Sequence, residues 1–224
     1  MSILPKFSKQ LGVVFSLIAI ASYSQNKTYS IAFGSCDNQR LNNELWKSID
    51  DNHPVAWIWG GDDVYSDTED MKELKDNYAI QKNDSDYLQF ISNKQILGTW
   101  DDHDYGLNDG GEEYPFKRES QQLLFDFLGT PNDAPERFRD GVYNSKVINI
   151  EGNKVKIIIL DTRFFRTAVT KSVNSKKRLQ PNPYGQGTIL GEAQWKWLEK
   201  QFQKPADIRL IGSGTQFGIE WNGY

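Results

Sequence analysis

Three acidic residues, a tyrosine and two glycines stand together in the stretch GGDDVYSDT, at residues 60–68. The stretch follows a short apolar run, 55–59, that proline and glycine bound in the manner of a strand buried on both faces. An isolated carboxylate is costly to desolvate, so Asp62 needs a cation or hydrogen-bond donors at such a strand end. A bound metal is the simplest compensation, and Tyr65 is a candidate for a second ligand.

A thiol, an imidazole and further acids follow two other apolar runs in the same way. Cys36 ends the run 28–36, and Asp102 and His103 follow the run 95–100. Cys36 is the only cysteine, and the alternative to a metal ligand is a small buried core residue. The acids around His103 also have an alternative, a solvated turn rich in Asp and Asn. We favour metal ligands because three strand ends repeat the same pattern.

Thiolate and phenolate are strong donors to a transition metal such as Fe(III), whereas carboxylates and amides suit calcium or magnesium. The residues therefore predict a mixed site in which Asp62 bridges two ions. Two adjacent cations stabilise the attacking and leaving oxygens of a displacement at phosphorus, so the predicted reaction class is phosphate ester hydrolysis. The second class of function is a non-catalytic, calcium-stabilised exported protein.

The segments between these runs have helical spacing. Apolar residues recur every three to four positions over 41–51 and predict a helix between the first two strands. A right-handed crossover then brings both strand ends to one edge of a sheet, with Cys36 and Asp62 within reach of one metal. Residues 69–93 predict two more helices before the third strand.

The second half of the chain predicts a helix, a hairpin, a long surface loop, a further helix and a last strand. Their expected ranges are, in that order, 116–128, 141–161, 167–187, 189–202 and 206–217. The loop is either a lid or a mobile segment. Arg163, after the hairpin, is a candidate phosphate contact, with a structural salt bridge to Asp161 as the alternative. His53 lies at a helix end, where an imidazole satisfies terminal carbonyls.

The first residues have the pattern of a secretory signal. Lys6 and Lys9 precede an apolar run at 11–21, and small residues follow it. We expect cleavage of residues 1–24 near Ser24 and a periplasmic or extracellular protein with no stable membrane anchor. The alternative is an uncleaved anchor, for which the apolar run is short.

Residues 25–224 have the composition of one folded domain. The 224-residue chain is 13% aromatic, which favours a packed core, and no linker divides it. Without the two lysines of the signal, 24 basic residues face 30 acidic ones, a net charge near −6. This balance argues against nucleic-acid binding.

Five short blocks resemble, in the same order, the landmarks of PhoD-like alkaline phosphatases within the metallophosphoesterase superfamily. The blocks are FGSC at 33–36, GGDDVY at 60–65, TWDDHD at 99–104, LDTR at 160–163 and ILGEAQWKWL at 189–198. The resemblance implies an α/β four-layer α/β/β/α sandwich with mixed sheets. It also implies an exported phosphatase or phosphodiesterase that acts on phosphate ester small molecules or phospholipid-type diesters.

The resemblance further implies a ligand set. Cys36 and Tyr65 match the residues that bind Fe(III), and Asp62 matches the bridging carboxylate. Asp102 stands where a ligand of the second ion is found, and that ion is expected to be Ca²⁺ rather than Zn²⁺ or Mg²⁺.

Two further positions are expected to face the substrate. His103 would lie close to the phosphate, where it could stabilise the transition state or protonate the leaving oxygen. Asn108 matches a frequent family asparagine and is assigned to substrate binding. The family also has a later Asp and His block, and nothing after Gly214 resembles it. We therefore expect the domain to lack its C-terminal part, with an inactive fragment as the alternative to an active enzyme.

Overall fold

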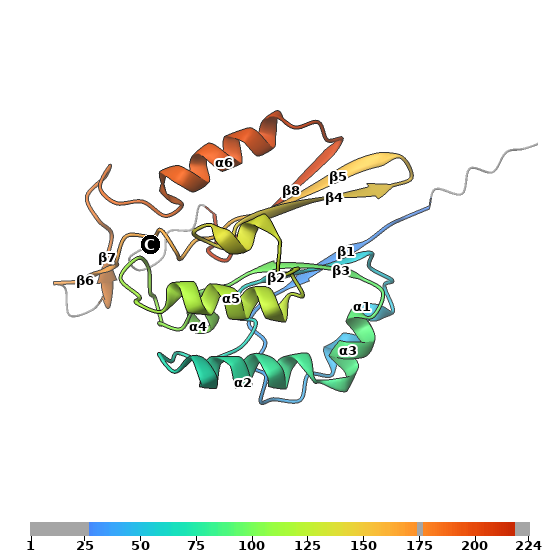
Figure 1. Ribbon diagram of the computed structural model, residues 1–224, viewed down its shortest axis with the longest axis horizontal. Coiled ribbons are helices and arrows are strands. Elements are labelled where there is room, and N and C mark those ends of the chain that lie inside the picture. The colour runs from blue at the N-terminus through green and yellow to red at the C-terminus, as the bar shows by residue number, and fades with distance from the viewer. Residues whose placement is uncertain (1–26, 174–176, 218–224) are drawn as a thin grey trace, which may run out of the picture.

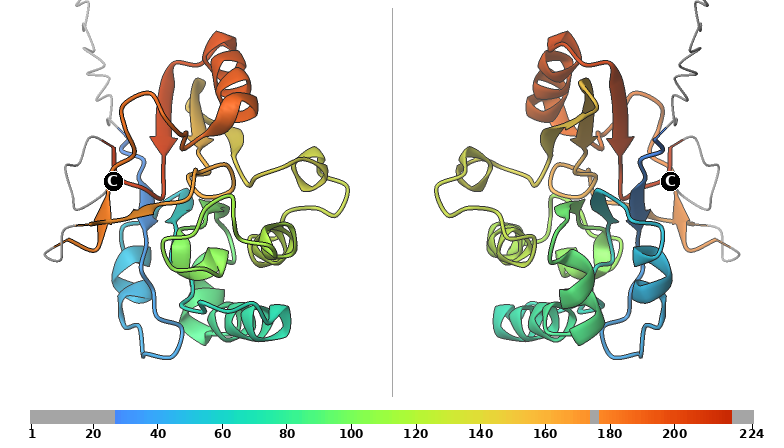
Figure 2. Two further views of the ribbon diagram at one scale, coloured as in Figure 1. Left: turned by 90° about the vertical axis from the view of Figure 1, so that its left-hand side faces the viewer. Right: turned by 90° about the vertical axis from the view of Figure 1, so that its right-hand side faces the viewer.

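The computed structural model describes residues 27–173 and 177–217. The expected signal at 1–24 lies outside these residues. Two three-stranded sheets lie face to face, and helices cover both outer faces (Figure 1). Figure 2 shows the same layers from two other sides. The predicted α/β sandwich is confirmed, and of its two three-stranded sheets one is mixed and the other parallel.

The first sheet is wholly parallel and has the order β1-β2-β3. Its strands are β1 (Ile31–Gly34), β2 (Ala56–Gly60) and β3 (Gln95–Thr99). Its crossover helices are α1 (Leu45–Asp50), α2 (Met71–Lys82) and α3 (Ser85–Ile91). β2 is almost entirely buried, as its apolar sequence predicts. The helix expected over 41–51 begins at Leu45, and its last turn is closed by the backbone amide of His53, which donates to Asp50 O at 2.8 Å.

The second sheet is mixed and has the order β4-β5-β8. β4 (Asn144–Ile150) and β5 (Asn153–Ile159) form the expected hairpin, and β8 (Ile208–Gly212) runs parallel to β5. The connection from β5 to β8 contains α6 (Gly191–Gln203), which covers this sheet (Figure 1).

Four smaller or connecting elements complete the described chain. They are α4 (Asp102–Tyr105), α5 (Lys117–Phe127), the 3-10 helix η1 (Pro135–Phe138) and the hairpin of β6 (Thr170–Lys171) and β7 (Leu179–Gln180). The loop expected at 167–187 therefore contains a short hairpin. The acidic stretch that follows β3 begins with one turn of helix, α4.

An aromatic core fixes the first sheet against its helices. Trp46 of α1 packs edge-on against Trp57 and Trp59 of β2, with ring centroids 5.3 and 5.6 Å apart. Between the sheets, Ile58 of β2 belongs to a smaller buried cluster with Leu97, Ile157 and Ile159. Burying each large side chain in this way stabilises the fold by about 1.5–3 kcal/mol. Because β2 and β3 are packed on both sides, the positions where these strands end are well defined.

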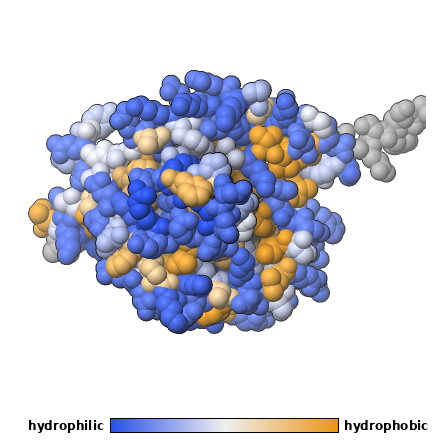
Figure 3. Space-filling model, viewed as in Figure 1, coloured by the Kyte–Doolittle hydropathy of each residue, from blue (hydrophilic) through white to orange (hydrophobic). Residues whose placement is uncertain are grey.

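The surface is mostly hydrophilic on the face shown in Figure 3, where hydrophobic residues gather chiefly on the right-hand half. Across residues 27–173 and 177–217, none of the helices combines the length and apolarity required to traverse a bilayer.

Candidate metal centre

The three parallel strands end side by side, and the loops that follow them form the centre. In the strand register, Gly34 lies opposite Trp59 and Gly60 opposite Thr99. The loops after β1 and β2 then run together, because Cys36 N donates to Gly61 O at 3.2 Å. The expectation that these strand ends share one edge of the sheet is met.

Asp62 lies where a thiol and a phenol meet. Cys36 Sγ and Tyr65 Oη are each 3.5 Å from the same oxygen, Asp62 Oδ2. The other oxygen, Asp62 Oδ1, is buried and has no hydrogen-bond partner among the residues that the structure describes. Cys36 is exposed, so it is not a core cysteine.

Asp102 and His103, from the first turn of α4, approach the same carboxylate. One potential ligand atom from each of Asp62, Asp102 and His103 lies within 4.8 Å of the other two. The structure therefore gathers all five residues that the sequence nominates for metal binding or proton transfer. It places them at the ends of three strands that lie far apart in the sequence.

The electrostatics of the cluster favour a cation. Burial raises the pKa of Asp62, and the charges of Asp101 and Asp102 raise it further. Partial loss of solvent and the charge of Asp62 also raise the pKa values of Cys36 and Tyr65, so both side chains hold their protons in the metal-free protein. A metal ion would give Asp62 Oδ1 a partner and draw the thiolate and phenolate forms onto itself. The residues present therefore fit a metal ion that accepts thiolate, phenolate and carboxylate ligands.

A buried aspartate behind the cluster joins the two loops that carry it. Asp104 accepts hydrogen bonds from the backbone amides of Asp62, Asp63 and Asp101, at 3.2, 3.1 and 2.8 Å. Asp62 has a φ of 52°, a left-handed conformation that Asp and Asn adopt more readily than most residues. Close packing also requires Gly61, whose added Cβ would lie 2.6 Å from Asp101 N.

His103 is held by a residue that the sequence did not single out. His103 Nδ1 is 2.7 Å from Asp67 Oδ2, and the ring of Tyr65 lies 4.4 Å from the imidazole. Burial lowers the pKa of His103, but the hydrogen bond and charge of Asp67, together with the charges of Asp62 and Asp102, raise it above its ordinary value. The Asp67 contact leaves Nε2 as the ring nitrogen available to a substrate.

The two expected substrate residues lie in different environments. Arg163 is only 2% exposed, and its Nε donates to Asp101 Oδ1 at 2.6 Å. The salt bridge considered in the sequence was to Asp161, but that carboxylate instead accepts the backbone amide of Arg163 at 2.9 Å. Asn108 is exposed in the loop after α4. Substrate contact by either residue stays a prediction.

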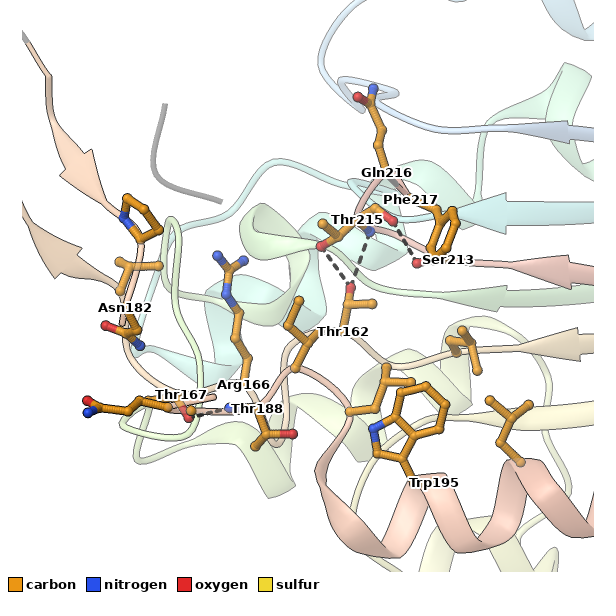
Figure 4. A pocket seen from close by; sticks show the side chains of 18 of the residues that line it. Thr162, Arg166, Thr167, Asn182, Thr188, Trp195, Ser213, Thr215, Gln216 and Phe217 are labelled. Atoms are coloured by element: carbon orange, nitrogen blue, oxygen red, sulfur yellow. Dashed lines mark hydrogen bonds between the residues drawn. The ribbon is translucent and has the colours of Figure 1, made fainter. Parts of the chain in front are cut away.

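A cavity of about 1070 Å³ lies between α6, the end of β8 and the 160–190 segment (Figure 4). Its walls include Trp195 and Phe202 on the apolar side and Thr162, Arg166 and Thr215 on the polar side. Its described lining contains none of the five residues of the candidate metal centre. The cavity is therefore separate from the candidate metal centre.

Comparison with known proteins bears on the fold. A solved structure named "Structure of PhoD" matches 80% of this chain with a TM-score of 0.61 and 16% sequence identity. The match covers 40% of that chain, so the present chain spans less than half the length of this neighbour. No protein-family model and no curated protein sequence matches the chain. The likeness shows a PhoD-like α/β fold.

Proposed function

We propose that this chain is a metal-dependent phosphoric ester hydrolase of the alkaline phosphatase D type, with a mixed Fe(III) and Ca²⁺ centre. The observation that carries the proposal is the meeting of Cys36 Sγ and Tyr65 Oη at one oxygen of Asp62, whose other oxygen is buried without a partner. A solved neighbour named for PhoD supports the same class.

Each ligand has a distinct role. Cys36 and Tyr65 would hold Fe(III), because thiolate and phenolate are strong donors to it, and Asp102 would hold Ca²⁺. Asp62 would help to hold both ions. When bound, the ions would supply charge stabilisation for the phosphate and its attacking and leaving oxygens.

The protein's own proton donor is His103. Asp67 contacts Nδ1 and so fixes the orientation of the imidazole ring. Nε2 is then the nitrogen that would give its proton to the oxygen of the leaving alcohol. In the metal-free protein, burial lowers the pKa of His103 and the contact with Asp67 and the charges of Asp62 and Asp102 raise it, with a net rise. Asp67 is therefore a positioning residue, and His103 is the acid.

The test combines metal content with turnover. The full chain, loaded with iron and calcium, should show a visible charge-transfer band from Tyr65 and hydrolyse p-nitrophenyl phosphate or bis(p-nitrophenyl) phosphate. A colourless, iron-free protein that calcium stabilises but that hydrolyses neither ester would establish the non-catalytic alternative. Binding of neither metal would overturn the proposal.

The proposal also includes the location of the protein and the substrates on which it acts. The protein would act in the periplasm or outside the cell after loss of residues 1–24, on small phosphate esters or phospholipid-type diesters. Its acidic balance argues against a nucleic-acid partner. Mass spectrometry of the secreted protein should place its N-terminus near Gln25, and a retained Met1 would contradict export by cleavage.

A further inference from the structure

One face of the metal centre is connected to a hairpin that contains none of its ligands. Asp102 Oδ2 accepts a hydrogen bond from the backbone amide of Asp109 at 2.8 Å. Its other oxygen lies 3.8 Å from Arg163 Nη2. The short Asp109 contact therefore helps to set the rotation of the Asp102 carboxylate.

Asp109 is itself held in an unusual position. Its φ is 57°, in the left-handed region, and only 7% of the residue is exposed. A left-handed conformation costs about 1–2 kcal/mol for a residue with a Cβ, and a buried carboxylate needs compensation. A cation close to the Asp109 carboxylate would compensate for its burial.

Arg178 of the β6–β7 hairpin supplies such a cation. Its guanidinium forms an ion pair with Asp109 Oδ2. The hairpin presents Arg178 from a fixed backbone, because Ser172 N donates to Arg178 O at 3.1 Å and the next residue, Leu179, is buried. The ion pair thus joins two segments that are distant in the sequence.

We infer that Arg178 is a positioning residue for the metal centre: through Asp109, it holds the carboxylate of Asp102 in the orientation that binds the second cation. The inference rests on the proposed function, in which Asp102 is a metal ligand. Residues that orient a metal ligand through a hydrogen bond typically change metal affinity by about 10- to 100-fold when they are removed.

The test is Ca²⁺ affinity of the full metal-free chain, measured by isothermal titration calorimetry. Arg178→Gln should weaken Ca²⁺ binding by about tenfold, and Arg178→Lys, which keeps the charge, should recover part of the loss. The matched control is Arg118→Gln. Arg118 also pairs with an aspartate, and its side chain is 67% exposed against 62% for Arg178. The control should bind Ca²⁺ like the unchanged protein.

Hydrogen exchange gives a second readout that needs no metal. In the metal-free protein, Arg178→Gln should speed amide exchange in the peptide 101–111, and Arg118→Gln should not. An unchanged Ca²⁺ affinity or an unchanged exchange rate in Arg178→Gln would overturn the inference and leave the proposed function standing. Absence of Ca²⁺ binding by the unchanged protein would overturn both.

Discussion

Replacing Asp62 with Asn should make the metal-free protein more stable while removing its response to metal. Asp62 is 7% exposed, and its Oδ1 lacks a hydrogen-bond partner in the described part of the chain. Burial and the neighbouring charges of Asp101 and Asp102 raise its pKa. Asn keeps the shape and tolerates the φ of 52°, so the substitution changes the charge with little effect on the backbone.

The size of the gain follows from the buried charge, because Asn keeps a polar atom at each position and removes only the ionised form. Burial of an unpaired charge costs more than burial of an amide, and a gain of about 1–2 kcal/mol is the expected value. For a domain of this length, the melting temperature should rise by about 2–8 °C. A carboxyl whose pKa is raised in the folded state contributes stability at low pH that is lost as pH rises through that pKa. The gain should therefore be seen at neutral pH and should vanish below about pH 4.

With metal bound, the unchanged protein should become more stable than Asp62→Asn. A cation at 100 times its dissociation constant stabilises the unchanged protein by about 2.7 kcal/mol, and Asp62→Asn should not respond. Urea unfolding with a chelator and with calcium, at pH 4 and pH 7.5, measures both effects. Asp133→Asn, at an exposed position, is the control for the charge change alone. A variant that is less stable without metal, or equally stabilised by calcium, would refute the reasoning.

Three further substitutions test separate parts of the centre. Cys36→Ser should lose iron and keep calcium, because a hydroxyl is a much poorer ligand than a thiolate; metal analysis measures this, and retained iron would remove Cys36 from the ligand set. Asp67→Asn should lower the pKa of His103 in the metal-free protein, since Asp67 is the main group that raises it; proton NMR titration of the imidazole gives the value, and an unchanged pKa would contradict the positioning role. Gly61→Ala should destabilise the protein by about 2–5 kcal/mol, because it combines a φ of 101° with a contact of 2.6 Å. The control Gly129→Ala has a φ of 71° and open space, so it should cost only about 1–2 kcal/mol in urea unfolding; equal losses would show that packing at Gly61 is unimportant.

The meeting of Cys36 and Asp62 could be predicted from the sequence because it depends only on strand order. Each residue follows an apolar run, and parallel strands joined by a right-handed crossover end at the same edge. Periodicity also located the helices of the first sheet to within a few residues. These features are set by backbone topology and need no knowledge of side-chain direction.

Contacts between loops could not be predicted in this way. Asp67 reaches His103 across 36 positions, and its own segment resembles an ordinary polar turn. Arg163 bonds to Asp101 rather than Asp161 through its side chain, because the choice depends on a rotamer that the pattern does not specify. The pairing of Arg178 with Asp109 requires a hairpin within a Pro- and Gly-rich segment.

One local signal was present in the sequence and was not used. Asp101 precedes α4, Asp104 stands three residues later and Gly106 follows the helix with a φ of 113°. An acidic residue before a helix, another three positions on and a glycine after it are typical of a short capped helix. This helix places Asp102 and His103 in one turn, so the acidic stretch is a structured support for the centre rather than a solvated loop.

Anomalous X-ray diffraction from crystals of the full chain, grown with iron and calcium and measured at the iron edge, tests the central claim most directly. The account predicts an iron peak within bonding distance of Cys36 Sγ, Tyr65 Oη and an Asp62 oxygen. A protein that binds iron elsewhere, or crystals with no peak between these three side chains, would contradict it.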